Sequence, residues 1–167
     1  MFTMFWNLCL LRTGPERMPT APAFIATVLA MNIALNIGAL PLMNRLSATA
    51  VGAIVATTAA IAAVTFAILS VKGLQARFAA TFIAIVGSDI IITIAQLALS
   101  PMVILLGGED MLEILFFASL LWALIVIGFI FQRALEVRYG VGFALGILLI
   151  LIVALISTQV DPPPPAA

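Results

Sequence analysis

The stretch FAATFIAIVGSDIIITIAQLALS, residues 78–100, holds one charged side chain in 23 residues, the carboxylate of Asp89. A bilayer core of about 30 Å is crossed by about 20 mostly apolar residues in a helix. The stretch is therefore long enough and apolar enough to span a membrane. Asp89 lies near its middle, where an ionised carboxylate costs about 2.5 to 3.5 kcal/mol on insertion scales. The segment thus predicts a membrane protein and asks why an acid is placed at its centre.

The rest of the chain has the same character. Of its 167 residues, 65% are hydrophobic and 8% are charged, whereas about 25% are charged in soluble domains. Four further apolar segments match the length of a span, and each is bounded by charged, Gly or Pro residues. We predict an all-α integral membrane protein, a bundle of five transmembrane helices within residues 20–158, with spans at 21–43, 48–71, 78–100, 112–131 and 140–158.

Three segments lie outside these spans. Residues 1–19 are predicted to form an amphipathic segment on the cytoplasmic face, in which residues 1–11 are too short to span and form an interfacial helix. Residues 101–108, PMVILLGG, either re-enter the membrane or extend the third span past Pro101. Residues 159–167 form a proline-rich tail that ends the last helix. Cys9, the one cysteine, is expected to be buried or to face lipid.

Basic residues set the expected orientation. Six of the seven fall before the first span or in the loops that join spans two to three and four to five; they are Arg12, Arg17, Lys72, Arg77, Arg133 and Arg138. Only Arg45 falls on the other face. Because short loops rich in Lys and Arg stay in the cytoplasm, we expect a cytoplasmic amino terminus and a carboxyl terminus on the other side of the membrane.

Small residues indicate where helices pack. Gly52, Ala56 and Ala60 follow one another at four-residue steps in the second span, and Gly142 and Gly146 have GxxxG spacing in the fifth. Such strips allow helices to approach closely in lipid. Packing within the same chain is the preferred interpretation of both, and homodimerisation is the alternative for the GxxxG pair alone.

Polar side chains gather near the middle of three spans. They are Asn32 and Asn36 in the first, Thr57 and Thr58 in the second, and Asp89, Thr93 and Gln96 in the third. No Lys, Arg or His lies within a span to pair with Asp89. Three interpretations follow: a protonated Asp89 that joins helices by hydrogen bonds, an Asp89 that binds a proton or cation during transport, or an Asp89 that meets a cationic residue of another subunit.

Several classes of function are disfavoured. The chain contains no histidine, no second acid lies at the depth of Asp89, and no phosphate-binding loop or metal-ligand spacing occurs. We therefore predict no enzymatic activity, no metal and no cofactor. The net charge is zero and basic stripes are missing, which argues against nucleic-acid binding.

Gly14 and Pro15, just before the first of five spans, resemble an element of the Yip family of membrane proteins, which is named for interaction with Ypt/Rab GTPases. Arg12 stands where that element has an acid, and Tyr139 and Gly140 are loosely similar to a second, Gly-Tyr-Gly-like element. The short chain is most similar in layout to the small bacterial relatives. The resemblance implies an inner-membrane protein with its carboxyl terminus in the periplasm.

The sequence leaves two hypotheses for function. The first is a non-catalytic scaffold or accessory subunit in the lipid bilayer that binds other membrane proteins or lipids. The second is a small proton- or ion-coupled transporter or channel that uses Asp89 together with Asn32 and Asn36.

Overall fold

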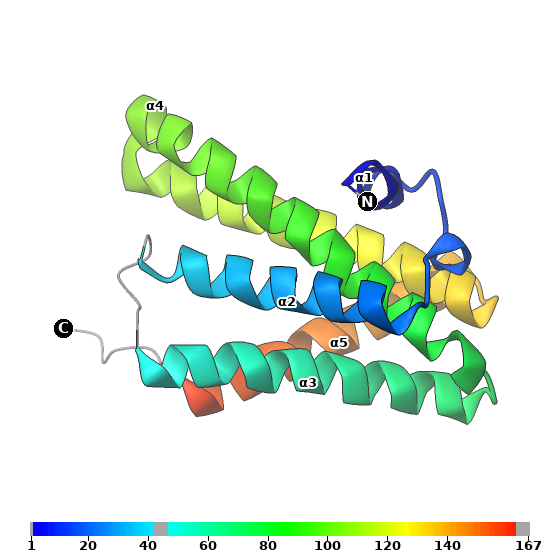
Figure 1. Cartoon of the computed structure of the whole chain (residues 1–167). Coiled ribbons are helices and arrows are strands. Elements are labelled where there is room, and N and C mark those ends of the chain that lie inside the picture. The colour runs from blue at the N-terminus through cyan, green and yellow to red at the C-terminus, as the bar shows by residue number, and fades with distance from the viewer. Residues whose placement is uncertain (1, 42–46, 163–167) are drawn as a thin grey trace.

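The protein is a bundle of long helices that run along a common axis (Figure 1). The computed structural model describes residues 2–41 and 47–162, with the backbone alone at 107–110. The helices are α1 Phe2–Cys9, α2 Pro22–Ala39, α3 Ala48–Val71, α4 Phe78–Leu135 and α5 Tyr139–Val160, and two short 3-10 helices, η1 Pro15–Arg17 and η3 Gln75–Arg77, join them. Within this part of the chain no strand is present, and the all-α prediction is confirmed.

Five helical segments are long and apolar enough to cross a membrane, as predicted. They are Pro22–Ala39, Ala48–Val71, Gln75–Leu106, Met111–Leu135 and Tyr139–Val160. Apart from Gln75–Arg77, which form η3, the third and fourth belong to the single helix α4, which doubles back so that its two halves run in opposite directions (Figure 1). Helical backbone continues through Pro101, so residues 101–106 extend the third span. The predicted ends at Met43 and in the proline-rich tail beyond residue 162 lie outside the described residues.

The helix ends follow from local sequence. Pro22 occupies the first turn of α2, where its missing N–H costs nothing. The Ser47 side chain caps α3 by accepting a hydrogen bond from the backbone N–H of Ala50 at 3.0 Å. At the other end of α3, Gly73 adopts the left-handed conformation, φ +69°, that terminates helices.

A basic residue fastens the two ends of α4 together. Arg77 donates to the backbone oxygen of Ala134 at 3.0 Å and to Oε1 of Glu136 at 2.6 Å. Glu136 itself has a left-handed backbone, φ 53°, and ends the helix. The guanidinium therefore caps the Ala134 carbonyl at the carboxyl end of α4, where a positive charge is favoured. This end of the bundle, which also holds η1 and the α4–α5 connection, is called the Arg77 end below.

Glycines bring α5 against the second half of α4. Gly142 and Gly146 are both buried, and a Cβ on Gly142 would collide with the backbone of Gly128 and Gln132. A Cβ on Gly128 would in turn lie 3.0 Å from the Cα of Phe143. The GxxxG pair is thus a contact within the chain, and it holds the two backbones close.

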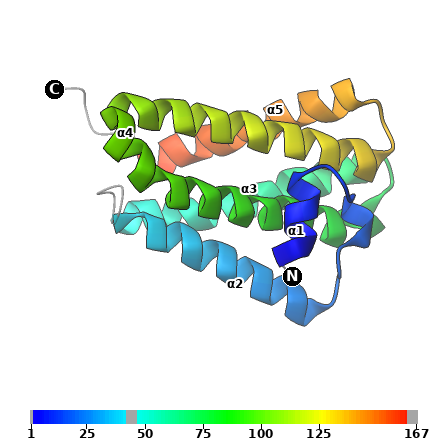
Figure 2. The ribbon, with the colours of Figure 1, turned by 90° about the horizontal axis from the view of Figure 1, so that it is seen from above.

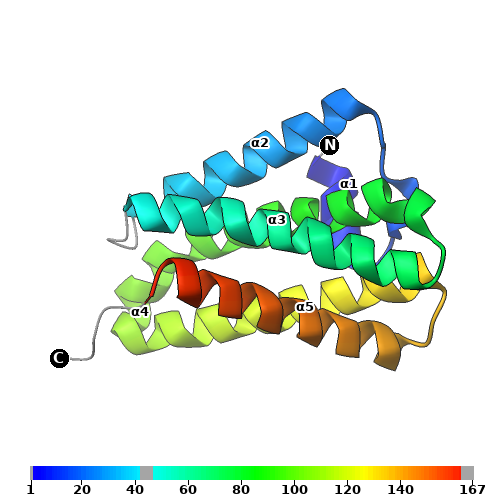
Figure 3. The same cartoon turned by 90° about the horizontal axis from the view of Figure 1, so that it is seen from below.

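The small-residue strip of α3 is used in part. Ala60 is buried, Ala56 is half-buried and Gly52 is exposed. A Cβ on Gly52 would lie 3.7 Å from Val160 of α5. The buried alanines of α3 include Ala50 and Ala53, so the packed strip is rotated from the predicted one. Figure 3 shows α3 and α5 running side by side.

The amino-terminal helix α1 crosses the bundle instead of lying parallel to it (Figures 1 and 2). Phe5 packs on Gly87 so closely that a Cβ there would collide with its ring. Trp122 donates from its indole nitrogen to the Cys9 carbonyl at 3.1 Å. Gly87 is about 14 Å along α4 from Phe78 at 1.5 Å per residue. The helix therefore packs on the first half of α4, where Gly87 leaves room for an aromatic ring.

Candidate functional site

Asp89 lies in the first half of α4 and accepts hydrogen bonds from α2. Nδ2 of Asn32 donates to Oδ2 of Asp89 at 2.7 Å, and Nδ2 of Asn36 donates to the same oxygen at 3.3 Å. Because Asn32 and Asn36 are one helical turn apart, both amides reach the carboxyl group from one face of α2. We call these three residues the Asp89 clasp. It joins the first span to the third by side-chain contacts.

Each asparagine also has a backbone partner. Asn32 lies 3.4 Å from the carbonyl oxygen of Val86, one turn before Asp89 on α4, and Asn36 donates to the carbonyl of Asn32 at 3.0 Å. Asn32 is buried, with 5% of its surface exposed. The amides are therefore held in place on both sides, and their donors are directed at the carboxyl group.

Asp89 is exposed although its partner Asn32 is buried, and it lines a cavity of about 210 Å³. All five spans contribute to its wall. The polar residues that line the cavity are Asn32, Thr58, Ser88 and Asp89, and the others are apolar side chains such as Ile127, Leu149 and Val153. The site is thus a small, mostly apolar chamber with one acid at its edge.

The threonines of α3 are bonded within their own helix. Thr57 donates to the carbonyls of Ala53 and Ile54, and Thr58 donates to that of Ile54 at 2.8 Å. Thr58 lines the Asp89 cavity, whereas Thr57 does not. The predicted convergence of the three spans thus brings Asn32, Asn36, Thr58 and Asp89 together and leaves Thr57 aside.

The polar stripe of the third span divides between two places. Asp89 faces the central cavity, and Gln96 lines a separate groove of about 510 Å³ between the two halves of α4. Ser100, Glu113, Phe116 and Phe117 also line that groove. Thr93 is half-buried and lines neither space. Helical periodicity places these residues on one stripe, but the packing partner changes along it.

Three contacts in the bundle were missed by reasoning from the sequence. They are the Phe5–Gly87 contact, the Trp122–Cys9 hydrogen bond and the Arg77–Glu136 ion pair. A glycine in the middle of a span is a signal for close approach, and it marks the first of them. The others join residues more than 50 positions apart, which a single sequence does not pair.

Cys9 shows the effect of this packing. Its thiol is buried against α4, 3.8 Å from the carbonyl oxygen of Ser88. Burial raises the pKa of the Cys9 thiol from about 9 to about 12. The thiol is therefore neutral at physiological pH, as suits a packing residue.

Metal binding has no evident place in the described part of the chain. In residues 2–41 and 47–162, apart from the side chains of 107–110, no group of three His, Cys, Asp or Glu side chains is close enough to hold an ion. Comparison with protein-family models, with curated proteins and with solved structures finds no match to this chain. The function has to be argued from the site itself.

Proposed function

We propose that this protein is a non-catalytic scaffold or accessory subunit of a bacterial inner membrane, which binds other membrane proteins or lipids. Its amino terminus is in the cytoplasm and its carboxyl terminus in the periplasm, because six of its seven basic residues are on the amino-terminal side. A Yip-like origin stays a prediction that rests on Gly14, Pro15 and the five-span layout.

The observation that carries the proposal is the Asp89 clasp. One oxygen of the carboxyl group accepts from two amides of a neighbouring span, at 2.7 and 3.3 Å. This is the arrangement expected of a polar residue that joins helices in lipid. An acid that is already bonded between spans has a structural role, so its presence in a membrane does not require transport or catalysis.

The bend between the two halves of α4 supplies a surface for a partner. Large apolar side chains are exposed at the bend between the two halves of α4, among them Leu105 with 86%, Leu106 with 73% and Phe117 with 64%. Figures 1 and 2 show the same bend standing apart from α2 and α3. Gln96, in the groove between the halves, makes no hydrogen bond to the described residues. A polar amide in lipid gains from a partner, so we assign the groove to a transmembrane helix of another protein.

Site-specific photo-crosslinking in the native membrane tests this assignment. A photoreactive residue in place of Leu105 should yield adducts with protein, whereas one in place of Leu155 on α5, 62% exposed, should yield adducts with lipid. The two positions are matched in residue type and exposure class. Equal lipid labelling at both, with a strictly monomeric protein in mild detergent, would contradict the proposal.

The cavity beside Asp89 favours a second candidate, a proton- or ion-coupled transporter. The exposed carboxyl group faces about 210 Å³ of space, which could hold a small cation. Proteoliposome flux should be compared between wild type and Asp89→Asn, because the amide retains an acceptor oxygen but does not titrate. A flux that is lost in Asp89→Asn would establish transport, and a flux unchanged by the substitution would exclude this role for Asp89.

A further inference from the structure

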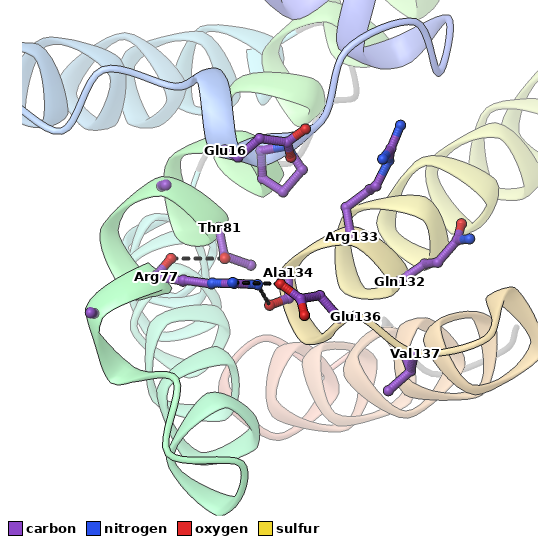
Figure 4. A pocket seen from close by; sticks show the side chains of 11 residues that line it. Glu16, Arg77, Thr81, Gln132, Arg133, Ala134, Glu136 and Val137 are labelled. Atoms are coloured by element: carbon purple, nitrogen blue, oxygen red, sulfur yellow. Dashed lines mark hydrogen bonds and ion pairs between the residues drawn. The ribbon is translucent and has the colours of Figure 1, made fainter.

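A second pocket lies at the Arg77 end of the bundle, apart from the Asp89 site. It has a volume of about 690 Å³ and lies between η1, the start of α4 and the end of its second half (Figure 4). Its polar lining consists of Glu16, Arg77, Thr81, Gln132, Arg133 and Glu136. Ala76, Ala80 and Val137 supply apolar wall. The volume is within the range of small-molecule sites, about 300 to 1,000 Å³.

Two of the four charges in this pocket neutralise each other. Arg77 and Glu136 form an ion pair at 2.6 Å, and Arg77 is further held by the Ala134 carbonyl. The Thr81 hydroxyl donates to the backbone oxygen of Arg77 at 2.8 Å. These residues build the floor of the pocket, and Arg77 retains N–H donors that its two hydrogen bonds do not use.

The other two charges have no ionic partner in the part of the chain that the structure describes. Arg133 is exposed and lies 5.5 Å from the ring centre of Phe129, a contact that steadies its position. Glu16 is exposed on η1. Figure 4 shows both side chains extending from different elements on the same side of the Arg77–Glu136 pair. One cation and one anion are therefore presented together at the mouth of a pocket.

We propose that this pocket binds the phosphoethanolamine headgroup of a phospholipid. Arg133, with the Gln132 amide and the remaining donors of Arg77, binds the phosphate, and Glu16 accepts from the ammonium group. This rests on the lipid-binding function and the cytoplasmic placement proposed above, which put the Arg77 end at headgroup depth. Phosphoethanolamine is then the class of lipid headgroup that the proposed function leaves open.

Charge complementarity selects a zwitterion. Because Arg77 and Glu136 pair with each other, the lining offers one further charge of each sign, so a purely anionic headgroup would meet Glu16 and a purely cationic ligand would meet Arg133. A phosphoethanolamine group carries one charge of each sign. The primary ammonium also donates hydrogen bonds to a carboxylate, which the quaternary ammonium of choline lacks. Ethanolamine lipids are therefore preferred over both choline and anionic lipids.

The Gly14–Pro15 element lies directly against Glu16. Pro15 is buried and begins η1, and the carboxylate of Glu16 lies directly over Gly14, where any Cβ would collide with it. Glycine at this position allows the acid to fold back over the chain.

Native mass spectrometry of the protein released from mixed-lipid nanodiscs tests the proposal. The discs contain phosphatidylethanolamine, phosphatidylcholine and phosphatidylglycerol in equal amounts. Wild type should retain phosphatidylethanolamine selectively. Glu16→Gln should lower its preference over phosphatidylcholine by about three- to tenfold, and Arg133→Gln should reduce retention of both. Arg138→Gln, an exposed basic residue at the same end outside the pocket lining, should leave the pattern unchanged.

Three results would overturn the proposal: equal retention of the three lipids, a preference for phosphatidylglycerol, or an Arg133→Gln protein that behaves as wild type. Soluble glycerophosphoethanolamine, added to protein in phosphatidylcholine discs, tests whether the pocket binds a lipid or a free ligand with the same headgroup. If glycerophosphoethanolamine binds as tightly as phosphatidylethanolamine, the pocket belongs to a soluble ligand, and the proposal that it binds a lipid is overturned. Partner adducts at Leu105 do not depend on the lipid pattern, so failure of this inference and failure of the proposed function are distinguishable.

Discussion

Breaking the Asp89 clasp should destabilise the bundle by a predictable amount. Interhelical hydrogen bonds in membrane proteins contribute about 0.6 kcal/mol on average and up to about 1.7 kcal/mol. The 2.7 Å bond from Asn32 is short, so we assign it the upper value of about 1.7 kcal/mol. The 3.3 Å bond from Asn36 is long, so we assign it the average of about 0.6 kcal/mol. Asp89→Leu removes both and should lower the free energy of unfolding by about 2 kcal/mol.

Asp89→Asn distinguishes the acceptor from the charge. Its amide oxygen can accept from Asn32 and Asn36 as the carboxyl oxygen does, so the loss should be below about 1 kcal/mol. Thr57→Val is a matched control, because the Thr57 hydroxyl bonds only carbonyls of its own helix. Its effect should lie within about 0.5 kcal/mol.

Reversible unfolding in mixed micelles, with the denaturing detergent titrated in, measures these free energies. An equal loss of unfolding free energy in Asp89→Asn and Asp89→Leu would refute the acceptor role of Asp89, since the charge itself would then be required. An equal effect of Asp89→Leu and Thr57→Val would show that the clasp contributes nothing to stability.

Three further predictions concern packing. Gly142→Ala places a Cβ against backbone and should cost about 1 to 3 kcal/mol in the micelle titration, whereas Gly140→Ala meets nothing within 4 Å and should be neutral; equal costs would contradict the close crossing. Burial raises the pKa of Cys9 to about 12, so maleimide labelling at pH 8 should be roughly 1,000-fold slower than for a thiol of pKa about 9. The free energy of unfolding should fall as the pH rises from about 9 to 12, since only the unfolded state ionises its thiol there. Rapid labelling of the folded protein would refute the burial of Cys9. Gly87→Ala should displace Phe5 and release α1, which would be seen as faster labelling of Cys9; an unchanged rate would show that α1 tolerates the added methyl.

Helix number, type and length could be predicted from the sequence because they depend on local hydrophobicity. The predicted span 48–71 coincides with α3, Ala48–Val71, since Ser47 caps one end and Gly73 closes the other. The third span was harder to end, because Pro101 is typical of a helix boundary. In this protein α4 accommodates it and continues.

The candidate site could be predicted in part. Depth and helical spacing were enough to associate Asp89 with Asn32 and Asn36, because residues one turn apart on facing spans meet at one level. They did not reveal that Thr57 bonds its own helix or that Gln96 lines another groove. Those outcomes depend on how each helix is rotated about its axis, which tertiary packing decides.

The position of α1 and the pocket at the Arg77 end depend on contacts between distant residues. Arg77 was counted only as a marker of orientation, yet it pairs with Glu136, 59 positions away. Charges at the ends of spans tell which side they face but not which of them meet. Only the folded hairpin brings the two ends of α4 together.

The measurement that tests the account most directly compares the proteins that co-purify with wild type and with Asp89→Asn from native membranes in mild detergent, quantified by mass spectrometry. If Asp89 is a hydrogen-bond acceptor inside a scaffold, both forms should retain the same membrane proteins in the same proportions. Loss of those proteins from Asp89→Asn, at unchanged stability, would show that the carboxylate itself meets a partner and would contradict the structural role assigned to the clasp.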